Sequence, residues 1–336
     1  MPNHLYNPTN FKLSVFFVQM ENILVTWSSW FIWFSLAKRL LDEWNNIIWI
    51  DNENDYYDVL LKEARRKILE KYDNFKFYKW DLWDIHLMDG IFKENKIDKV
   101  VNLAAQAWVR YSIINPFSYI QSNLVWFHNI LFLSKEYKVK NFVYASSSSV
   151  YWNNKKQPSS IDDKVDNPIS LYAATKKSNE LIAHSYSHLF WLPTIWLRFF
   201  TVYWPWSRPD MAMLKFTHKI VKWEAIDVYN YWKMKRDFTY IDDIVDWIIR
   251  SLNYETNYDI FNLWSDKPIE LEYLITLLED NLWIKAIKNY MPLQDGDVLE
   301  TSADIEYTRK KLWWEPKFKI EEWVKNFSDW FKEFYI

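Results

Sequence analysis

Short apolar runs alternate along the chain with longer stretches whose apolar residues recur at helical spacing. The first run, Asn22–Thr26 (NILVT), predicts a buried strand, and Phe31–Leu41 has the spacing of an amphipathic helix. We expect further strands at Asn46–Asp51, Phe75–Lys79, Lys99–Leu103, Asn141–Ser146 and Pro193–Phe199. The helices expected between them are Tyr57–Lys71, Ile85–Asn95, Pro116–Tyr137 and Leu171–Phe190. This alternation predicts an α/β fold built on a Rossmann-type, doubly wound parallel sheet.

The pattern changes at both ends of the chain. After about Tyr203 the alternation becomes irregular, so we expect residues 20–202 to be mainly a cofactor-binding domain and residues 203–336 mainly a smaller substrate-binding region interleaved with it. Residues 1–19 contain a short apolar run without the basic region or cleavage site of a signal peptide. Met20 stands directly before the first strand, and we expect it to be the true start, with residues 1–19 a spurious or disordered extension.

Composition narrows the class of protein. The chain has 336 residues, of which 50% are hydrophobic and 25% charged, which is typical of a folded globular protein. A net charge of −3 gives no electrostatic basis for binding nucleic acid or an anionic membrane. No apolar run reaches the roughly 18 residues that would span a bilayer. The lack of cysteine excludes thiolate chemistry and fits a reducing compartment, so we expect a cytoplasmic protein.

Glycine is almost missing. The chain has 2 glycines and 23 tryptophans, whereas average usage of about 7% predicts roughly 24 glycines. The excess of tryptophan therefore nearly equals the deficit of glycine. Tryptophan cannot replace glycine where the backbone needs a positive φ or a close approach.

The tryptophans stand where glycine is expected. The first strand runs into TWSSWFIW at residues 26–33, and Trp27, Trp30 and Trp33 have the spacing GxxGxxG. In dinucleotide-binding folds, glycines at this strand–turn–helix junction let pyrophosphate approach the backbone N–H groups. Three indoles would fill that space. Further tryptophans lie in turn-like surroundings, namely Trp44, Trp152, Trp191, Trp204 and Trp232.

One cause would explain this pattern. Some bacterial lineages read the codon UGA as glycine, whereas a common alternative code reads it as tryptophan. We therefore hypothesise that most tryptophans here are mistranslated glycines, the alternative being a chain that is truly rich in tryptophan. Trp206, Trp330 and one of Trp313 and Trp314 have the surroundings of genuine tryptophans, and Trp83 is undecided.

Acidic residues follow the second and third strands. Asp51 ends the second strand about twenty residues after the loop, where a carboxylate bonds the ribose hydroxyls of NAD and repels a 2′-phosphate. The alternative is a turn residue at a strand end. Asp81, after the third strand, is placed to bond the adenine amino group. NAD is therefore the expected cofactor. We expect no metal, because His184 and His188 lie four residues apart without a third ligand.

A possible acid–base pair lies on the helix at 171–190. Tyr172 and Lys176 are four residues apart and share one helix face. An ammonium beside a phenol favours the phenolate, which makes tyrosine a usable base. YxxxK alone is a weak motif. Here it follows the serine-rich end of the fifth strand, where a hydroxyl can bond the same substrate oxygen.

With glycine restored, residues 20–335 resemble the UDP-glucuronate 4-epimerases of the extended short-chain dehydrogenase/reductase superfamily. The matching stretches are DNENDYYD (51–58), LAAQAWVRYS (103–112), YASSSSVYW (144–152), SLYAATKKSNE (170–180), LRFFTVYWPWSRPDMA (197–212) and DVYNYWKMKRDFTYIDDIV (227–245).

The resemblance implies a reaction and its residues. Tyr172 would take the proton of the sugar 4-OH while hydride passes from C4 to tightly held NAD⁺, and the 4-keto sugar would turn over and receive the hydride on its other face. Ser147 would bond the same oxygen, with Ser148 and Ser149 as alternatives, and Lys176 would bond the nicotinamide ribose. The implied cofactor-binding residues are Trp27, Trp30, Phe31, Ile32, Trp33, Asp51, Asn52, Asp81, Leu82, Ala104, Ala105, Tyr172 and Lys176.

Substrate contacts follow from the same resemblance. Thr201 and Arg208 would hold the C6 carboxylate, for which the bidentate donors of arginine are suited. Arg110 and Arg236 are candidates for the carboxylate or the diphosphate, with Ser148 and Ser149 beside the sugar. Taken alone, an arginine is more often a surface or structural residue.

The sequence departs from the family at some positions and leaves alternatives open. Ser207 stands where the family usually has glycine, and the Asp-Glu pair of the related 4,6-dehydratases is absent, which disfavours dehydration. The alternatives are a UDP-glucose or UDP-N-acetylglucosamine 4-epimerase or, if the tryptophans are genuine, a non-catalytic scaffold. The family suggests a homodimer built from the helices around 116–137 and 170–190.

Overall fold

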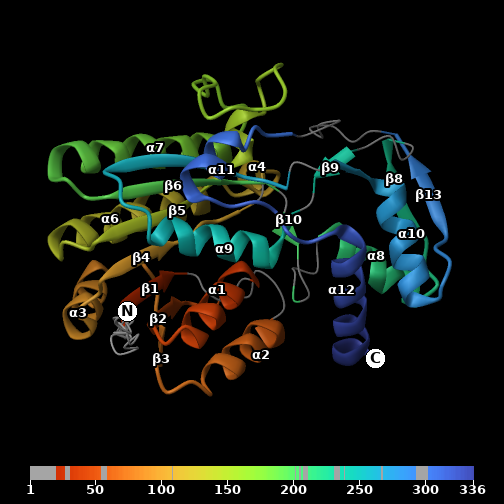
Figure 1. Ribbon diagram of the computed structural model, residues 1–336, viewed down its shortest axis with the longest axis horizontal. Coiled ribbons are helices and arrows are strands. Elements are labelled where there is room, and N and C mark those ends of the chain that lie inside the picture. Colours follow the sequence, from red (N-terminus) through yellow and green to blue (C-terminus); the bar gives the residue numbers. More distant parts are fainter. Residues whose placement is uncertain are drawn as a thin grey trace, which may run out of the picture.

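The computed structural model describes residues 20–26, 31–53, 59–107, 109–200, 202–203, 206, 211–230, 235–237, 239–265, 268–292 and 302–336. At its centre is a parallel sheet of seven strands in the order β11-β6-β5-β4-β1-β2-β3 (Figure 1). These strands are β1 (Asn22–Thr26), β2 (Asn46–Asp51), β3 (Phe75–Lys79), β4 (Lys99–Asn102), β5 (Asn141–Ser147), β6 (Thr194–Phe199) and β11 (Tyr258–Leu263). The expected doubly wound parallel sheet is confirmed.

Both faces of the inner strands are buried, which explains why β1, β2 and β4 are apolar runs, whereas the edge strand β3 (FKFYK) is only half-buried. Side chains alternate between the faces, so Ile23 and Val25 of β1 join one core cluster while Leu24 joins the other. The same alternation separates Val101 from Val100 in β4. Each strand therefore contributes to two cores, one beneath each layer of helices.

Helices cover the two faces as separate layers (Figure 1). One layer consists of α3 (Ile85–Asn95), α6 (Trp126–Glu136) and α7 (Leu171–Phe190), with α6 against β4 and α7 against β5 and β6. The other contains α1 (Phe31–Asp42), α2 (Val59–Leu69), α9 (Ile241–Leu252) and α11 (Glu306–Leu312). The start of α7 is fixed by Ser170, whose side chain accepts a hydrogen bond from the Ala173 N–H.

The single helix expected at 116–137 is wrong in detail. After the short α4 (Tyr111–Ile114), the chain forms α5 (Pro116–Tyr119), a π-helical turn η1 (Ile120–Val125) and then α6. The apolar spacing continues through all three segments, so the pattern alone does not reveal the wider turn. π-Helical turns are frequent at functional sites.

Beyond residue 202 the chain is more regular than its proline content suggested. The helices there, besides α9 and α11, are α8 (Ala212–Val221), α10 (Leu271–Leu282) and α12 (Ile320–Tyr335). Among the described residues, three strand pairs accompany them: β7 (Val202–Tyr203) with β10 (Thr239–Tyr240), β8 (Ile226–Tyr229) with β13 (Lys288–Met291), and β9 (Lys235–Asp237) with β12 (Pro268–Glu270). Figure 1 shows α8, α10 and α12 beside the sheet layers.

The two parts of the chain share the central sheet. Strand β11 pairs with β6, and α9 packs against α1, although both elements come after residue 202. The expected division at residues 202 and 203 stays a prediction. No helix among the described residues is long and apolar enough to cross a membrane.

Candidate active site

The candidate site lies where the parallel strands end. Strands β1 and β4 are neighbours at the centre of the sheet, and their crossovers run to opposite faces, which makes this seam the topological switch point. Thr26 Oγ1 donates a 2.6 Å hydrogen bond to Asn102 Oδ1 and accepts one from the Leu103 N–H at 3.2 Å. These bonds fix the start of the loop that carries the buried, small side chains of Ala104 and Ala105.

Carboxylates stand at the ends of β2 and β3, as expected. Asp51 is buried and accepts a 2.6 Å hydrogen bond from the Glu53 N–H. Asn52 Nδ2 donates to Asp81 Oδ2 at 3.2 Å, while Asp81 Oδ1 is buried and has no hydrogen-bond partner among the described residues. An unsatisfied buried acceptor is costly, so the site suits a ligand that donates hydrogen bonds there. Leu82 is buried beside it.

The loop after β4 is tied to α7 by Asn123, which sequence reasoning missed. Asn123 lies in the π-helical turn and is completely buried. Its side chain accepts from the Gln106 N–H at 2.7 Å and donates to the Gln106 carbonyl and to Thr175 Oγ1 at 3.1 and 3.0 Å. In the sequence, the only indication of this role is a polar asparagine within an apolar helical pattern, and the pattern does not indicate which groups it bonds.

Tyr172 and Lys176 occupy the first turns of α7. Lys176 is buried, and its Nζ donates a 2.8 Å hydrogen bond to the Ala145 carbonyl of β5. Burial lowers the pKa of Lys176 to about 7, and the negative charge of Glu180 acts in the opposite direction. Tyr172 is half-buried, and its ring meets that of Tyr119 edge-on at 6.1 Å. The pair is thus held against the strand that ends in the serines.

The serines lie at the carboxyl end of β5. Ser147 Oγ accepts a 3.2 Å hydrogen bond from the Ser149 N–H, which begins the short 3-10 helix η2 (Ser148–Tyr151). Ser149 is buried, and its hydroxyl has no partner among the described residues, whereas Ser148 is half-buried. Helix α7 packs against both β5 and η2. The structure therefore brings the serine segment and the Tyr/Lys helix together.

A buried ion pair lies behind this constellation. Arg198 of β6 makes two hydrogen bonds to the Glu180 carboxylate, at 3.0 and 2.8 Å, and Ser146 Oγ donates to Glu180 at 2.6 Å. Arg198 also donates to the Tyr151 hydroxyl, which donates to Asn262 Oδ1 at 2.9 Å. Sequence reasoning missed this network, although an arginine inside the apolar strand TIWLRF requires a buried partner.

The remaining candidates are less well defined. Ile32 and Trp33 are buried in the first turn of α1, which Phe31 opens, and the Trp33 ring lies 6.5 Å from that of Phe199. Arg110 is exposed just before α4. Arg236 lies in β9 in register with Ile269. Four expected residues lie outside the described residues, namely Trp27, Trp30, Thr201 and Arg208.

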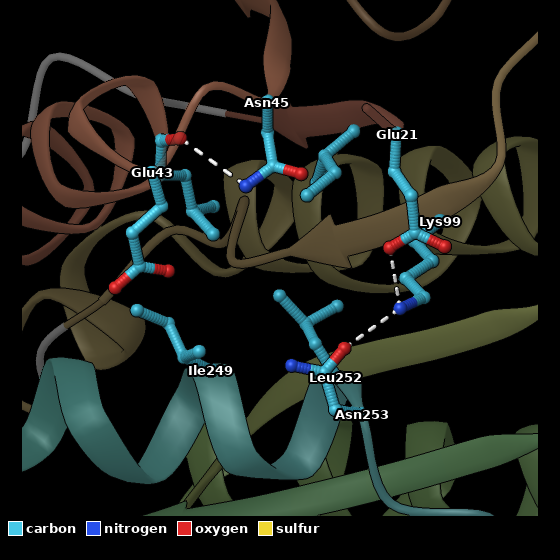
Figure 2. A pocket seen from close by; sticks show the side chains of 9 residues that line it. Glu21, Glu43, Asn45, Lys99, Ile249, Leu252 and Asn253 are labelled. Carbon is cyan, nitrogen blue, oxygen red and sulfur yellow. Dashed lines mark hydrogen bonds and ion pairs between the residues drawn. The ribbon is translucent and has the colours of Figure 1, made fainter. Parts of the chain in front are cut away.

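A separate pocket lies at the opposite, amino-terminal end of the strands. Figure 2 shows it lined by Glu21, Lys99 and Asn253. Lys99 Nζ is 2.5 Å from Glu21 Oε2 and donates to Asn253 Oδ1 at 2.8 Å. The polar groups of this pocket thus satisfy one another. Because ligands of doubly wound sheets bind at the carboxyl ends of the strands, this pocket is not the candidate active site.

The fold and the site define a dinucleotide-binding enzyme with a serine, a tyrosine and a lysine at its centre. Residues 23–263 match the model of the NAD dependent epimerase/dehydratase family, and the chain belongs to that family. NAD is its cofactor, and the carboxylates of Asp51 and Asp81 fit the hydrogen-bond donors of the adenosine half.

Relatives and solved structures are similar over almost the whole chain. The UDP-glucuronate 4-epimerase of Thermodesulfobacterium geofontis is 42% identical over 94% of this chain and 97% of that protein. The Bacillus cereus UDP-glucuronic acid 4-epimerase in complex with UDP-glucuronic acid and NAD has a TM-score of 0.85 at 28% identity, covering 94% and 100% of the chains. A UDP-N-acetylglucosamine 4-epimerase from Methanobrevibacter ruminantium M1 has a TM-score of 0.84 at 28% identity, covering 94% and 99%.

Proposed function

We propose that this chain is an isomerase that interconverts UDP-glucuronate and UDP-galacturonate with NAD as a resident cofactor. The observation that carries the proposal is the placement of Tyr172 and Lys176 on α7, packed against the serine-rich end of β5. The similarity to UDP-glucuronate 4-epimerases over nearly the full length supports the acidic sugar as substrate.

We assign a separate role in the reaction to the cofactor and to each side chain of the site. Bound NAD would supply the acceptor for a hydride from C4 of the sugar and the donor for its return to the other face. Tyr172 holds the 4-OH proton, removing it as C4 is oxidised and returning it as C4 is reduced. Ser147 bonds the same oxygen, and Ser149 supplies a buried hydroxyl beside it. The Lys176 ammonium favours the phenolate of Tyr172, because a nearby positive charge lowers the pKa of a phenol.

The residues that we assign to cofactor binding lie at the carboxyl ends of the strands. We assign Asp51 and Asn52 to the ribose and Asp81 and Leu82 to the adenine. Ala104 and Ala105 offer small side chains against the cofactor, on a loop that Asn123 holds in place. Thr201 and Arg208 remain our candidates for the C6 carboxylate, with Arg110 and Arg236 for the carboxylate or the diphosphate.

The assay uses protein isolated from its source cells, so that its result does not depend on the identity of residues 27, 30 and 33. The protein is incubated without added NAD with UDP-glucuronate, UDP-glucose or UDP-N-acetylglucosamine, and the products are separated by anion-exchange chromatography. We expect UDP-galacturonate from UDP-glucuronate. Conversion of only the neutral sugars would support the alternative substrate, and no conversion of any sugar would support the scaffold.

Arg208→Ala tests the carboxylate assignment. Removing one partner of a buried, hydrogen-bonded charge pair costs at least about 2 kcal/mol, so kcat/KM for UDP-glucuronate should fall at least about 30-fold. Turnover of a neutral UDP-sugar should change only a few-fold, and the two substrates are compared in parallel steady-state assays. Equal losses for both would overturn the assignment of Arg208 to the carboxylate.

We also propose a homodimer formed by α5, η1 and α7. Exposed apolar side chains on or beside these elements support it, notably Phe117, Ile120, Leu181 and Leu189. The cytoplasmic location expected from the sequence stays a prediction.

A further inference from the structure

Tryptophan occupies an unusual share of the left-handed backbone positions. Ten described residues other than glycine have a positive φ, and six of them are tryptophans. The left-handed region brings the Cβ atom too close to the following carbonyl oxygen, so bulky residues rarely adopt it. If 23 tryptophans were distributed at random among 336 residues, about one tryptophan would be expected among ten such positions.

Five of the six stand at or just after the end of a helix. Trp191, Trp283 and Trp313 end α7, α10 and α11 with φ values of 58°, 60° and 51°. Trp44 and Trp223 follow α1 and α8 in the same way, with φ values of 65° and 59°. All five indoles are exposed and add no buried area. The left-handed residue at a helix end is usually glycine, because glycine has no Cβ to clash.

Inside the molecule, other tryptophans are too close to their neighbours. Aromatic rings in proteins usually pack with centroids about 4.5–7 Å apart. Trp247 and Trp314 have centroids 3.6 Å apart, Trp323 and Tyr203 are 3.9 Å apart, and Trp264 and Phe200 are 4.0 Å apart. These are the three shortest ring separations in the described part of the chain. In each pair, the space between the surrounding residues accommodates one ring but not two.

The structure assigns glycine, not tryptophan, to eight positions of the functional protein. Five are the left-handed helix ends, and three are the crowded interior positions; together they are Trp44, Trp191, Trp223, Trp247, Trp264, Trp283, Trp313 and Trp323. Trp314 remains tryptophan, because its ring is buried against position 247, where a glycine would relieve the crowding. Trp330 also remains, since its ring contacts Phe327, Phe334 and Tyr335 at 5.6–5.8 Å.

This inference resolves the choice between Trp313 and Trp314 that the sequence left open. Trp206 shows that a backbone angle alone does not decide the residue. Its φ is 75°, yet its ring packs at 6.1, 5.3 and 4.7 Å against those of Phe34, Trp330 and Phe334. For this reason the assignment rests on a positive φ combined with an exposed ring, or on crowded rings.

Peptide sequencing by tandem mass spectrometry of the protein from its source cells tests the assignment without any assay of activity. We expect glycine at the eight positions, encoded by UGA, and tryptophan at 314 and 330. If the peptides contain tryptophan at positions 191, 283 and 313, the proposal for the helix ends is wrong. Tryptophan at Trp247, Trp264 and Trp323 would overturn it for the interior.

A pair of neighbouring substitutions gives a matched test in recombinant protein. Trp313→Gly should raise Tm by about 1–3 °C, because it relieves a left-handed residue without removing buried surface. Trp314→Gly should lower Tm, because it empties a buried site. A lower Tm for Trp313→Gly as well would contradict the assignment at that position.

A second inference concerns Glu180 and rests on the proposed function. Glu180 lies one helical turn after Lys176 on α7, and both side chains are buried. We propose that Glu180 is a positioning residue that keeps Lys176 protonated beside the catalytic tyrosine. The groups around the two are Arg198 on β6, Lys177 on α7, whose Nζ is 3.7 Å from Glu180 Oε2, and the tyrosines Tyr144 on β5, Tyr151 on η2 and Tyr258 on β11. Burial raises the pKa of all three tyrosines, so they stay neutral, and Arg198 stays charged.

The sign of the effect follows from the charges. The carboxylate of Glu180 raises the pKa of Lys176 against the effect of burial. Glu180→Gln should therefore lower that pKa and move the alkaline limb of the kcat profile to lower pH, by about half a unit or more. Arg198→Met removes the opposing cation and should move the limb upward. Glu180→Asp keeps the charge and should restore the original limb.

Two controls separate this inference from a purely structural role and from the proposed function itself. Ser146→Ala removes a hydrogen bond to Glu180 but no charge, so the alkaline limb should not move. The pKa of Lys176 is also followed by NMR of protein labelled with ¹³C at the lysine Cε atoms, which needs no turnover. A Lys176 pKa that is unchanged in both Glu180→Gln and Arg198→Met would overturn the role of Glu180, even if the enzyme acts on another sugar.

Discussion

Lys176 illustrates how burial and one neighbouring charge set the pKa of a side chain that we propose to act near neutral pH. Burial lowers the pKa of Lys176 to about 7, against the opposite effect of the Glu180 charge, so the ammonium and the amine are both populated at physiological pH. Such a group responds strongly to a single neighbouring charge. The sequence shows the Tyr172–Lys176 spacing, but it does not show how burial and the Glu180 charge together set the pKa of Lys176. That pKa depends on how β5 and β6 pack against α7.

Tyr172→Phe is the direct test of the acid–base role. Phenylalanine keeps the ring and its contact with Tyr119 but has no proton to exchange, so kcat should fall by about 10²–10⁴-fold. Steady-state assays with UDP-glucuronate measure the loss, and calorimetry checks that the substrate still binds. A kcat within a few-fold of the unsubstituted enzyme would assign the base to another residue.

At the level of single residues, the sequence predicts those functional groups that stand in a local motif. Asp51 and Asp81 are found at the strand ends where the motif places them. Asn123 and Arg198 were missed, because their partners lie 17 or more positions away and meet them only through the fold. No local spacing encodes such a contact.

Among the secondary-structure elements, the buried parallel strands were the easiest to predict. β1, β2 and β3 begin and end at the expected residues, because turns bound each short apolar run. β11 was missed because the prolines after residue 203 predict irregular structure, whereas helix α9 directly precedes Tyr258–Leu263 and forms the crossover to it. The π-helical turn was missed because the apolar spacing of 116–137 fits a continuous helix equally well.

At the helix ends, the backbone conformation indicates positions suited to glycine that the sequence does not show. The C-cap residues that follow α7, α10 and α11 adopt the left-handed conformation although each is a tryptophan. The geometry of an element is thus set by its whole surroundings, even where one residue opposes it. This is why positions suited to glycine remain visible in the fold of a chain that has 2 glycines.

In the whole molecule, the central sheet joins the two parts of the chain. β11 and α9 come from the later part, yet they complete one edge and one face of the sheet that carries the serines. Asn262, on β11, donates to the carbonyls of Ser159 and Asp304 at 3.1 and 3.2 Å and receives the Tyr151 hydroxyl. The catalytic face and the later part of the chain are therefore linked through one buried polar network.

The apolar surface of α5 and α7 leads to a prediction for the whole assembly. Phe117 and Leu181 are 83% and 59% exposed, although both are large and apolar, and a second copy of this chain would bury them. Phe117→Lys combined with Leu181→Lys should convert the proposed dimer into a monomer, because burying two unpaired charges opposes association. Light scattering after size-exclusion chromatography measures the mass.

The matched control places the same charges elsewhere. Leu60→Lys with Ile287→Lys alters exposed apolar residues of α2 and of the segment between α10 and β13, away from the proposed interface, and should leave the mass unchanged. Circular dichroism confirms that each variant is folded. If the unsubstituted chain is already a monomer at micromolar concentration, the assignment of α5 and α7 to a dimer interface is wrong, and their apolar surface requires a different partner.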